Sequence, residues 1–319
     1  MLTRLFEGGD PFLMLYGGKY YIYCTTENDR TLEVPNAFDT EKNGNDGFYV
    51  YVSNDLKTWE NKGLCLDKKN AVGERWFWSP EVSYYNGKFY MLYSAEQSLA
   101  VAVSDSPTGP FVKLTDGWLR NSTIDGHLLF DDDGSIYIYF ADLKNNNRIF
   151  AGKMSADLIK IEYECENVLI EATEPWETRD CLVAEGPFVL KHNGLYYLTY
   201  STNHTRSEDY AVGYAVSDKP FGPFVKSENN PILHKPGKLV GTGHHSFMPT
   251  ADKDKFICAF HCHSGNPDNF KPRMVCLSAA GFEKQNGKPD RLCIMTDKTV
   301  TGDKNDTARS DLQKHLNIP

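Results

Sequence analysis

Five chemically distinctive residues recur at nearly the same place before five similar strand-like segments of the sequence. They are Asp10, Trp78, Asp125, Glu185 and His244, which lie ten to twelve residues before matched positions of those segments. Four of the five can ionise, where a purely structural repeat would carry small or apolar side chains. If three carboxyl groups converge on one axis they repel one another, so at least one should have a raised pKa.

Two carboxyl groups with a third that tunes them can hydrolyse a glycosidic bond. One carboxylic acid protonates the departing oxygen, while a carboxylate activates a water molecule. Aromatic side chains stack on the faces of sugar rings, and Trp78 and Phe12 are our candidates for that contact. We therefore expect a carbohydrate site where the repeats meet.

The elements that must position these residues are five copies of a turn followed by an aromatic-rich strand. Asn-Gly and Asp-Gly turns, at 86–87, 133–134 and 193–194, are typical of two-residue hairpins. The matched strand positions are 47 to 69 residues apart and are Tyr20, Phe89, Ile136, Tyr196 and Phe256. A second short strand that reaches a Ser follows each copy, at 49–53, 101–105, 150–155, 213–218 and 274–278.

Five strand-rich repeats predict an all-β fold, a five-bladed β-propeller, in which equivalent positions of the inner strands converge on a central channel. A two-domain β-sandwich is the alternative, but it does not predict five matched copies. No long stretch of helical periodicity is present, which disfavours α/β folds. We expect residues 1–295 to form the catalytic propeller domain and 296–319 a closing segment or tail. The segment 25–47 is interpreted as an insertion at the rim of the first blade.

The composition narrows the class of function. The 319 residues include 34 Lys and Arg against 43 Asp and Glu, a net charge of −9 that disfavours a nucleic-acid partner. No apolar run approaches the 18 residues of a membrane span, and the first ten residues lack the apolar stretch of an export signal. Eight scattered cysteines without a CxxC pair favour buried, reduced thiols. We therefore expect a cytoplasmic protein with no membrane partner; a removed export signal and the oligomeric state stay open.

Taken together, the motifs resemble glycoside hydrolase family 43, inverting five-bladed propellers that break down arabinan and xylan. The resemblance covers about residues 9–295 and rests on the segments 10–11, 78–81, 124–125, 131–134, 185–188 and 241–244. It implies arabinose- or xylose-containing oligosaccharides as substrates and no cofactor for the chemistry. One departure is Gly126-His127, where many members carry Pro after the Asp.

By this resemblance, Asp10 is the general base and Glu185 the general acid, while Asp125 orients Glu185 and raises its pKa. Inversion needs room for a water molecule, so the two reacting carboxyl groups should lie roughly 6.5–9.5 Å apart. Arg273 corresponds to an arginine that binds the sugar in several members.

His244 corresponds to a channel histidine that in many members lies beside calcium or a water cluster. The resemblance therefore implies a possible structural calcium ion in the central channel near His244. His261 and His263 share one face of a strand while Cys262 points away, which disfavours a single metal site there. One of these two histidines is instead a candidate to reach the channel mouth.

Three functions compete for the sequence. The leading hypothesis is an exo-acting glycosidase that releases terminal α-L-arabinofuranosyl or β-D-xylosyl residues from plant cell-wall oligosaccharides, because a cytoplasmic enzyme meets imported short chains. An endo-acting arabinan hydrolase on the same fold would need an open groove. A non-catalytic sugar-binding propeller belongs to another class, and three close carboxyl groups argue against it. The choice between arabinose and xylose stays open.

Overall fold

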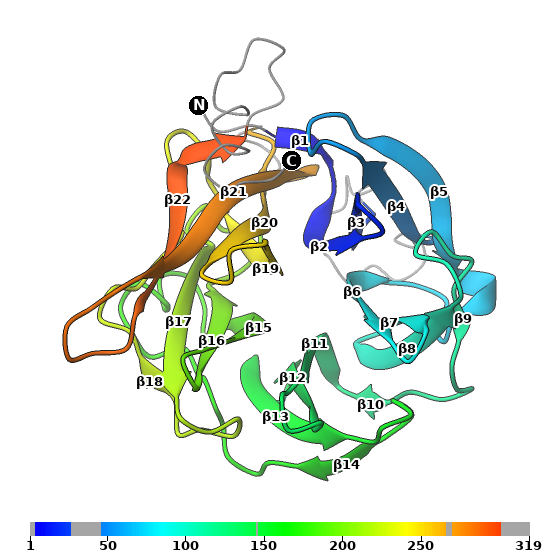
Figure 1. Cartoon of the computed structure of the whole chain (residues 1–319), viewed down its shortest axis with the longest axis horizontal. Coiled ribbons are helices and arrows are strands. Elements are labelled where there is room, and N and C mark those ends of the chain that lie inside the picture. The colour runs from blue at the N-terminus through cyan, green and yellow to red at the C-terminus, as the bar shows by residue number, and fades with distance from the viewer. Residues whose placement is uncertain (1–3, 27–45, 145, 266–269, 301–319) are drawn as a thin grey trace.

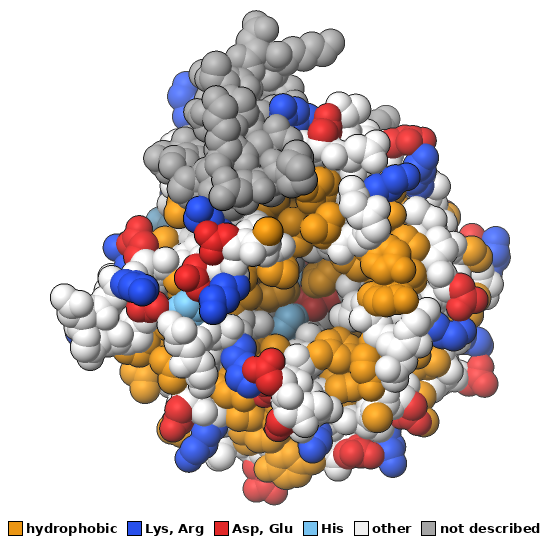
Figure 2. Space-filling model, in the orientation of Figure 1, with side chains coloured by type: hydrophobic (Ala, Val, Ile, Leu, Met, Phe, Trp, Pro, Cys, Tyr) orange, Lys and Arg blue, Asp and Glu red, His pale blue; other side chains and the backbone are white. Residues whose placement is uncertain are grey.

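The protein is a five-bladed β-propeller, as predicted, with five antiparallel sheets arranged around a central axis (Figure 1). The computed structural model describes residues 4–26, 46–144, 146–265 and 270–300. Most of the predicted insertion at 25–47 lies outside the described residues. In Figure 2 the centre of the molecule is hollowed, and a histidine and acidic side chains lie inside the hollow among hydrophobic side chains.

In each blade, consecutive strands of the chain lie side by side, from the axis outward. Tight turns join the first two strands where the sequence predicted them, for example at Asn86-Gly87 and Asn193-Gly194. All four of these turn residues have positive φ. The strands are β2 (Gly9–Tyr16), β3 (Lys19–Thr25), β4 (Gly47–Ser53) and β5 (Glu60–Asp67) in blade 1; β6 (Trp78–Tyr85), β7 (Lys88–Ala95), β8 (Ser98–Ser104), β9 (Val112–Lys113) and β10 (Arg120–Asn121) in blade 2; β11 (Thr123–Phe130), β12 (Ile136–Asp142), β13 (Arg148–Met154) and β14 (Ile161–Glu164) in blade 3; β15 (Ala184–His192), β16 (Leu195–Thr202), β17 (Ala211–Ser217) and β18 (Val225–Lys226) in blade 4; and β19 (Gly243–Pro249), β20 (Lys255–His263), β21 (Arg273–Glu283) and β22 (Arg291–Val300) in blade 5. A short 3-10 helix, η1 (Lys68–Asn70), follows β5.

The inner strands form a closed ring. Each of β2, β6, β11 and β15 contacts the inner strand of the next blade, and β19 contacts β2. The strand β1 (Arg4–Glu7) precedes blade 1 in the chain but pairs with β21 of blade 5, where Arg4 is opposite Cys276. The last blade therefore contains strands from both ends of the described chain, a closure that the repeats did not predict.

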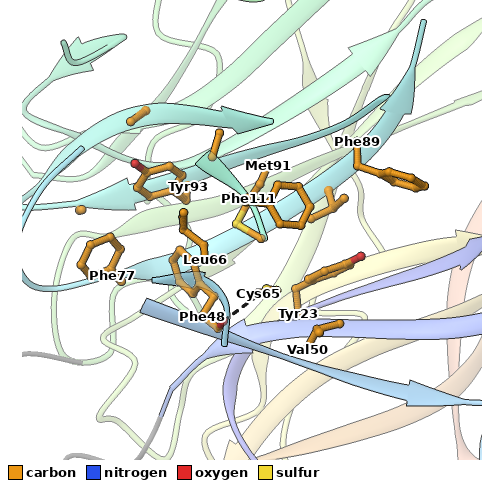
Figure 3. Packing of buried hydrophobic residues seen from close by; sticks show 14 of the residues in the cluster. Tyr23, Phe48, Val50, Cys65, Leu66, Phe77, Phe89, Met91, Tyr93 and Phe111 are labelled. Atoms are coloured by element: carbon orange, nitrogen blue, oxygen red, sulfur yellow. Dashed lines mark hydrogen bonds between the residues drawn. The ribbon is translucent and has the colours of Figure 1, made fainter. Parts of the chain in front are cut away.

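Five hydrophobic clusters hold the blades together, one at each interface between neighbouring blades. Figure 3 shows the cluster between blades 1 and 2, where Tyr23 and Phe48 of blade 1 face Phe77, Met91 and Tyr93 of blade 2. Strand aromatics thus fill the wedge-shaped spaces between twisted sheets. Most of the aromatic content of the chain is in this way structural.

The sequence also led to expectations about the cysteines and about the domain boundary. All eight cysteines are free thiols, and six of them are buried. The predicted domain boundary at residue 295 falls within β22, residues 301–319 lie outside the described part, and the division into domains stays a prediction. Within the described residues, no helix is long and apolar enough to cross a membrane.

Candidate active site

Every inner strand carries a β-bulge near its start. The pairing of each inner strand with its neighbour shifts register there, and one residue at each bulge takes a left-handed backbone with φ between 44° and 58°. These residues are Asp10, Ser79, Asp125, Gly186 and His244. The non-glycine ones each cost on the order of 1–3 kcal/mol in backbone strain, which the closed ring of blades must hold.

The bulges show which of the five proposed residues occupy equivalent positions in their blades. Asp10, Asp125 and His244 occupy the bulge position itself, whereas Trp78 and Glu185 each lie one residue earlier. In a regular strand, neighbouring residues point to opposite faces of the sheet. Because the bulge re-aims its side chains, residues from both adjacent positions nevertheless line one cavity.

That cavity has a volume of about 370 Å³ and receives side chains from all five blades. The residues proposed from the sequence that line it are Asp10, Trp78, Asp125, Glu185, His244 and Arg273. Phe12, the second candidate for sugar stacking, does not line it. Phe12 follows the bulge and packs against the cores between blades 1 and 2 and between blades 4 and 5.

Asp10 is a buried carboxylate in a strongly cationic environment. Its Oδ1 accepts a hydrogen bond of 2.6 Å from Arg273 Nη1, and its Oδ2 accepts one of 2.6 Å from Thr25 Oγ1. Burial alone would raise the pKa of Asp10, but Arg273 and then His244 hold it well below its usual range. Gly9 makes the approach possible, since a Cβ there would overlap the Arg273 guanidinium at 2.0 Å. Asp10 is therefore ionised.

Asp125 is held between blades 2 and 4. Its Oδ1 accepts a hydrogen bond of 2.7 Å from Ser79 Oγ, and its Oδ2 accepts one of 3.1 Å from the backbone N–H of Gly186. Burial and the negative charge of Asp10 raise the pKa of Asp125, against the opposite effect of His244. The contact to Gly186 links Asp125 to the residue that directly follows Glu185.

Glu185 carries the raised pKa expected from carboxyl convergence. Burial, and then the charge of Asp125, raise the pKa of Glu185 to about 7. Tyr210 donates its hydroxyl to Oε1 at 3.0 Å and Asn147 donates its amide to Oε2 at 2.9 Å, which fixes the carboxyl plane. Near neutral pH this group can give up a proton, while Asp10 in the same cavity can accept one.

His244 lies between the carboxyl groups of Asp10 and Asp125. Its Nδ1 is 3.3 Å from Asp10 Oδ1 and 3.8 Å from Asp125 Oδ2, and these charges together raise its pKa against the effect of burial. Calcium takes six to eight oxygen ligands, and water molecules are among them. Among the described residues, no group of three or more His, Cys, Asp or Glu side chains could hold a metal ion. A calcium ion beside His244 therefore stays an expectation from the resemblance.

A pair of tryptophans forms one wall of the cavity. Trp78 and Trp76 are stacked, with ring centroids 6.1 Å apart and an interplanar angle of 11°. The guanidinium of Arg75 lies 4.7 Å from the ring centroid of Trp76 and, paired with Glu96, backs this wall. The wall offers an aromatic face for a sugar ring, and Trp76 was not proposed from the sequence.

Sequence reasoning also missed the donors to Glu185. Asn147 directly precedes β13 and Tyr210 directly precedes β17, so both lie just before the third strand of their blades. A comparison of those matched positions could have found them. His261, one of the two histidines expected near the channel mouth, reaches Asp10, whose backbone N–H donates to His261 Nδ1 at 3.1 Å.

Comparisons with known proteins agree with the fold and identify the family. The sequence model described as Glycosyl hydrolases family 43 matches residues 6–286. The chain is 31% identical to a beta-xylosidase of Xylanibacter ruminicola, over 86% of this chain and 92% of that protein. It is 28% identical to a xylosidase/arabinosidase of Bacteroides ovatus, over 68% and 75% of the two chains. The crystal structure of an endo-1,4-beta-xylanase from Bacteroides thetaiotaomicron has a TM-score of 0.79 and 35% identity, covering 92% of this chain and 96% of that one.

Proposed function

The chain belongs to glycosyl hydrolases family 43, and from that premise we propose an inverting exo-glycosidase that releases terminal α-L-arabinofuranosyl or β-D-xylosyl residues from plant cell-wall oligosaccharides. The protein is a glycoside hydrolase of the arabinofuranosidase or xylosidase type, and its chemistry needs no cofactor. The proposal adds the direction of attack, the mode of cleavage and the residues. Its cytoplasmic location, acting on imported short chains, is part of the proposal.

The observation that carries the proposal is the opposite protonation of two carboxyl groups in one cavity. Arg273 and His244 keep the pKa of Asp10 low against the effect of burial, whereas burial and then Asp125 raise that of Glu185 to about 7. Carboxyl groups whose environments separate their pKa values in this way are suited to act as a base and an acid in one reaction.

In the proposed reaction, Glu185 gives its proton to the glycosidic oxygen as the bond from that oxygen to the anomeric carbon breaks. Asp10 takes a proton from a water molecule, whose oxygen bonds to the anomeric carbon from the opposite face, so the configuration inverts. Asp125 keeps Glu185 protonated through its charge and holds the neighbouring backbone at Gly186. Arg273 keeps Asp10 in place through their ion pair.

The shape of the cavity supports exo action. Its volume of about 370 Å³ is near the lower end of the range for ligand pockets, roughly 300–1,000 Å³, and side chains from all five blades surround it. Such a cavity suits one terminal sugar better than a long chain that continues in both directions. Trp78 and Trp76 supply the stacking surface.

An endo-acting hydrolase is the second candidate, favoured by the similarity to the endo-1,4-beta-xylanase of Bacteroides thetaiotaomicron, which is 35% identical to this chain. Products from linear arabinan and xylan distinguish the two. An exo enzyme releases only monosaccharide from the start, whereas an endo enzyme releases oligosaccharides of mixed length. A non-catalytic sugar-binding propeller would bind oligosaccharide in calorimetry without any turnover.

The residue roles are tested by Glu185→Gln and Asp10→Asn on two kinds of substrate. On xylobiose or arabinobiose, each variant should lose about 10²–10⁴-fold in kcat. A nitrophenolate leaves with little protonation, so on nitrophenyl glycosides Glu185→Gln should lose much less than Asp10→Asn. Activity of both variants within a few fold of wild type on both substrates would contradict the roles. NMR of the first product formed should show the inverted anomer, and retention would overturn the inverting mechanism.

A further inference from the structure

The segment that joins β16 to β17 forms part of the cavity mouth and is firmly anchored. His204, Thr205 and Arg206 of this segment line the cavity. His263 Nε2 donates to the carbonyl of Thr205 at 2.8 Å, and the backbone N–H of Arg206 donates to His204 Nδ1 at 3.1 Å. The segment ends at Tyr210, which donates to Glu185, so its position is tied to that of the proposed acid.

Arg206 places a positive charge at this mouth. Its guanidinium lies 5.6 Å from the ring centroid of Phe270, another lining residue. Within the described residues, no carboxylate lies within ion-pair distance of it. Partial burial lowers the pKa of Arg206, and burial together with the charge of Arg206 lowers that of His204. By contrast, Arg75 on the tryptophan wall is paired with Glu96.

The carboxyl groups deeper in the cavity do not cancel this charge. Asp10 is neutralised by its ion pair with Arg273, and His244 lies between Asp10 and Asp125. Burial and then Asp125 raise the pKa of Glu185 to about 7, so Glu185 is largely uncharged below neutral pH. Lys271, whose Nζ lies 5.9 Å from the Phe270 centroid, adds a cation at the same wall. Among the described lining residues, Arg206 and Lys271 thus bring two cations to this side of the mouth, and Asp180, which accepts from the backbone N–H of His204 at 3.3 Å, is a nearby negative charge.

We propose that Arg206, whose guanidinium lies over the ring of Phe270, selects oligosaccharides in which the sugar next to the cleaved terminal residue carries a carboxylate, as in uronic-acid-substituted chains. This inference rests on the proposed glycosidase function and names its substrate class. A guanidinium pairs with a carboxylate through two parallel hydrogen bonds, a geometry that a neutral hydroxyl cannot match. Because the contact is at the solvent-exposed mouth, it discriminates by a modest factor.

The test uses a matched pair of substrates: a xylo-oligosaccharide bearing a uronic acid on the penultimate sugar, and the same compound with its carboxyl group reduced to the alcohol. We expect wild type to prefer the acidic compound about two- to fivefold in kcat/KM, the size of an exposed ion pair. Arg206→Gln should bring this ratio to about one, mainly because KM rises for the acidic compound. Added salt at about 0.5 M should also lower the wild-type ratio.

Arg179→Gln is the matched control, because Arg179 pairs with Asp209 and does not line the cavity. It removes the same charge nearby and should leave the ratio unchanged. A wild-type ratio of one or less, or a ratio insensitive to Arg206→Gln, would overturn the inference while hydrolysis of the neutral compound kept the proposed function intact. If neither compound is cleaved, the proposed function fails. Calorimetry of both compounds with Glu185→Gln then still tests the preference for a carboxylate. Tighter binding of the acidic compound supports the inference, and equal binding of the two compounds overturns it.

Discussion

At the scale of single residues, the cavity separates three buried carboxyl groups by what touches them. Asp10 has a guanidinium in direct contact, and this ion pair outweighs the effect of its burial. Glu185 has only neutral donors, Tyr210 and Asn147, so burial and the charge of Asp125 dominate. The two groups thus differ in protonation because one is paired with a cation and the other is not.

The raised pKa of Glu185 leads to a prediction about pH dependence. A general acid must be protonated, so activity should be lost as the pH rises through that pKa, about 7. Asp125→Asn removes a negative charge that favours the protonated form, so the alkaline limb of kcat/KM should move to lower pH, by roughly one unit.

Tyr210→Phe provides the opposite change for comparison. It removes a hydroxyl that stabilises the ionised form of Glu185, so the alkaline limb should move to higher pH. Profiles of kcat/KM between pH 4 and about 10 would show both shifts. Limbs that stay in place, or that move in the same direction in both variants, would contradict this account of Glu185.

At the scale of elements, two turns of similar sequence each accept a hydrogen bond from the neighbouring blade. The sequence contains two similar segments, 106–111 and 219–224, after the third strands of blades 2 and 4. Each accepts a tyrosine hydroxyl from the preceding blade: Tyr23 donates to the carbonyl of Pro107 at 2.6 Å, and Tyr139 to that of Pro220 at 2.9 Å. The repetition of sequence therefore reflects a repeated contact between blades.

Removing one of these hydroxyl groups should weaken the protein without changing its cavity. Tyr139 is fully buried, so Tyr139→Phe leaves the Pro220 carbonyl without that donor and should lower the free energy of unfolding by about 1–2 kcal/mol. Urea denaturation would measure it. Tyr163→Phe is the control, since Tyr163 is 52% exposed. An equal effect of both substitutions would show that the buried contact contributes nothing.

At the scale of the whole molecule, stability depends on closing the ring between the first and last blades. Strand β1 pairs with β21 in blade 5, and its Phe6 stacks on Tyr51 of blade 1 with ring centroids 3.9 Å apart. Trp59 packs edge-on against Phe6 at 5.9 Å. The N-terminal strand thus belongs to one blade by its hydrogen bonds and contacts the next by its side chain.

Phe6→Ala should therefore destabilise the propeller as a unit. Loss of a half-buried aromatic side chain should lower the free energy of unfolding by roughly 1–3 kcal/mol, and curves followed by fluorescence and by circular dichroism should shift together. Leu15→Ala serves as the control, because Leu15 is 46% exposed. A Phe6→Ala midpoint in urea no lower than that of Leu15→Ala would mean that β1 is dispensable for closure.

The number of blades and the three carboxyl groups of the cavity could be predicted from the sequence alone. Turns and aromatic strands are local signals, and each blade must bury the same wedge-shaped interface, so the pattern repeats five times along the chain. For the same reason Asp10, Asp125 and Glu185 could be singled out, since converging inner strands bring matched positions together. Their chemical roles stay predictions.

Which atoms lie in contact could be learned from the three-dimensional structure and not from the sequence. The structure showed that Phe12 packs against the hydrophobic cores, and that Tyr210 and Asn147 donate hydrogen bonds to Glu185. It also paired Asp10 with Arg273, 263 residues away in the chain, and closed the ring through β1. These contacts depend on the bulges and on the packing of one blade against another. They arise between segments far apart in the sequence, where no local pattern of residue types records the partner.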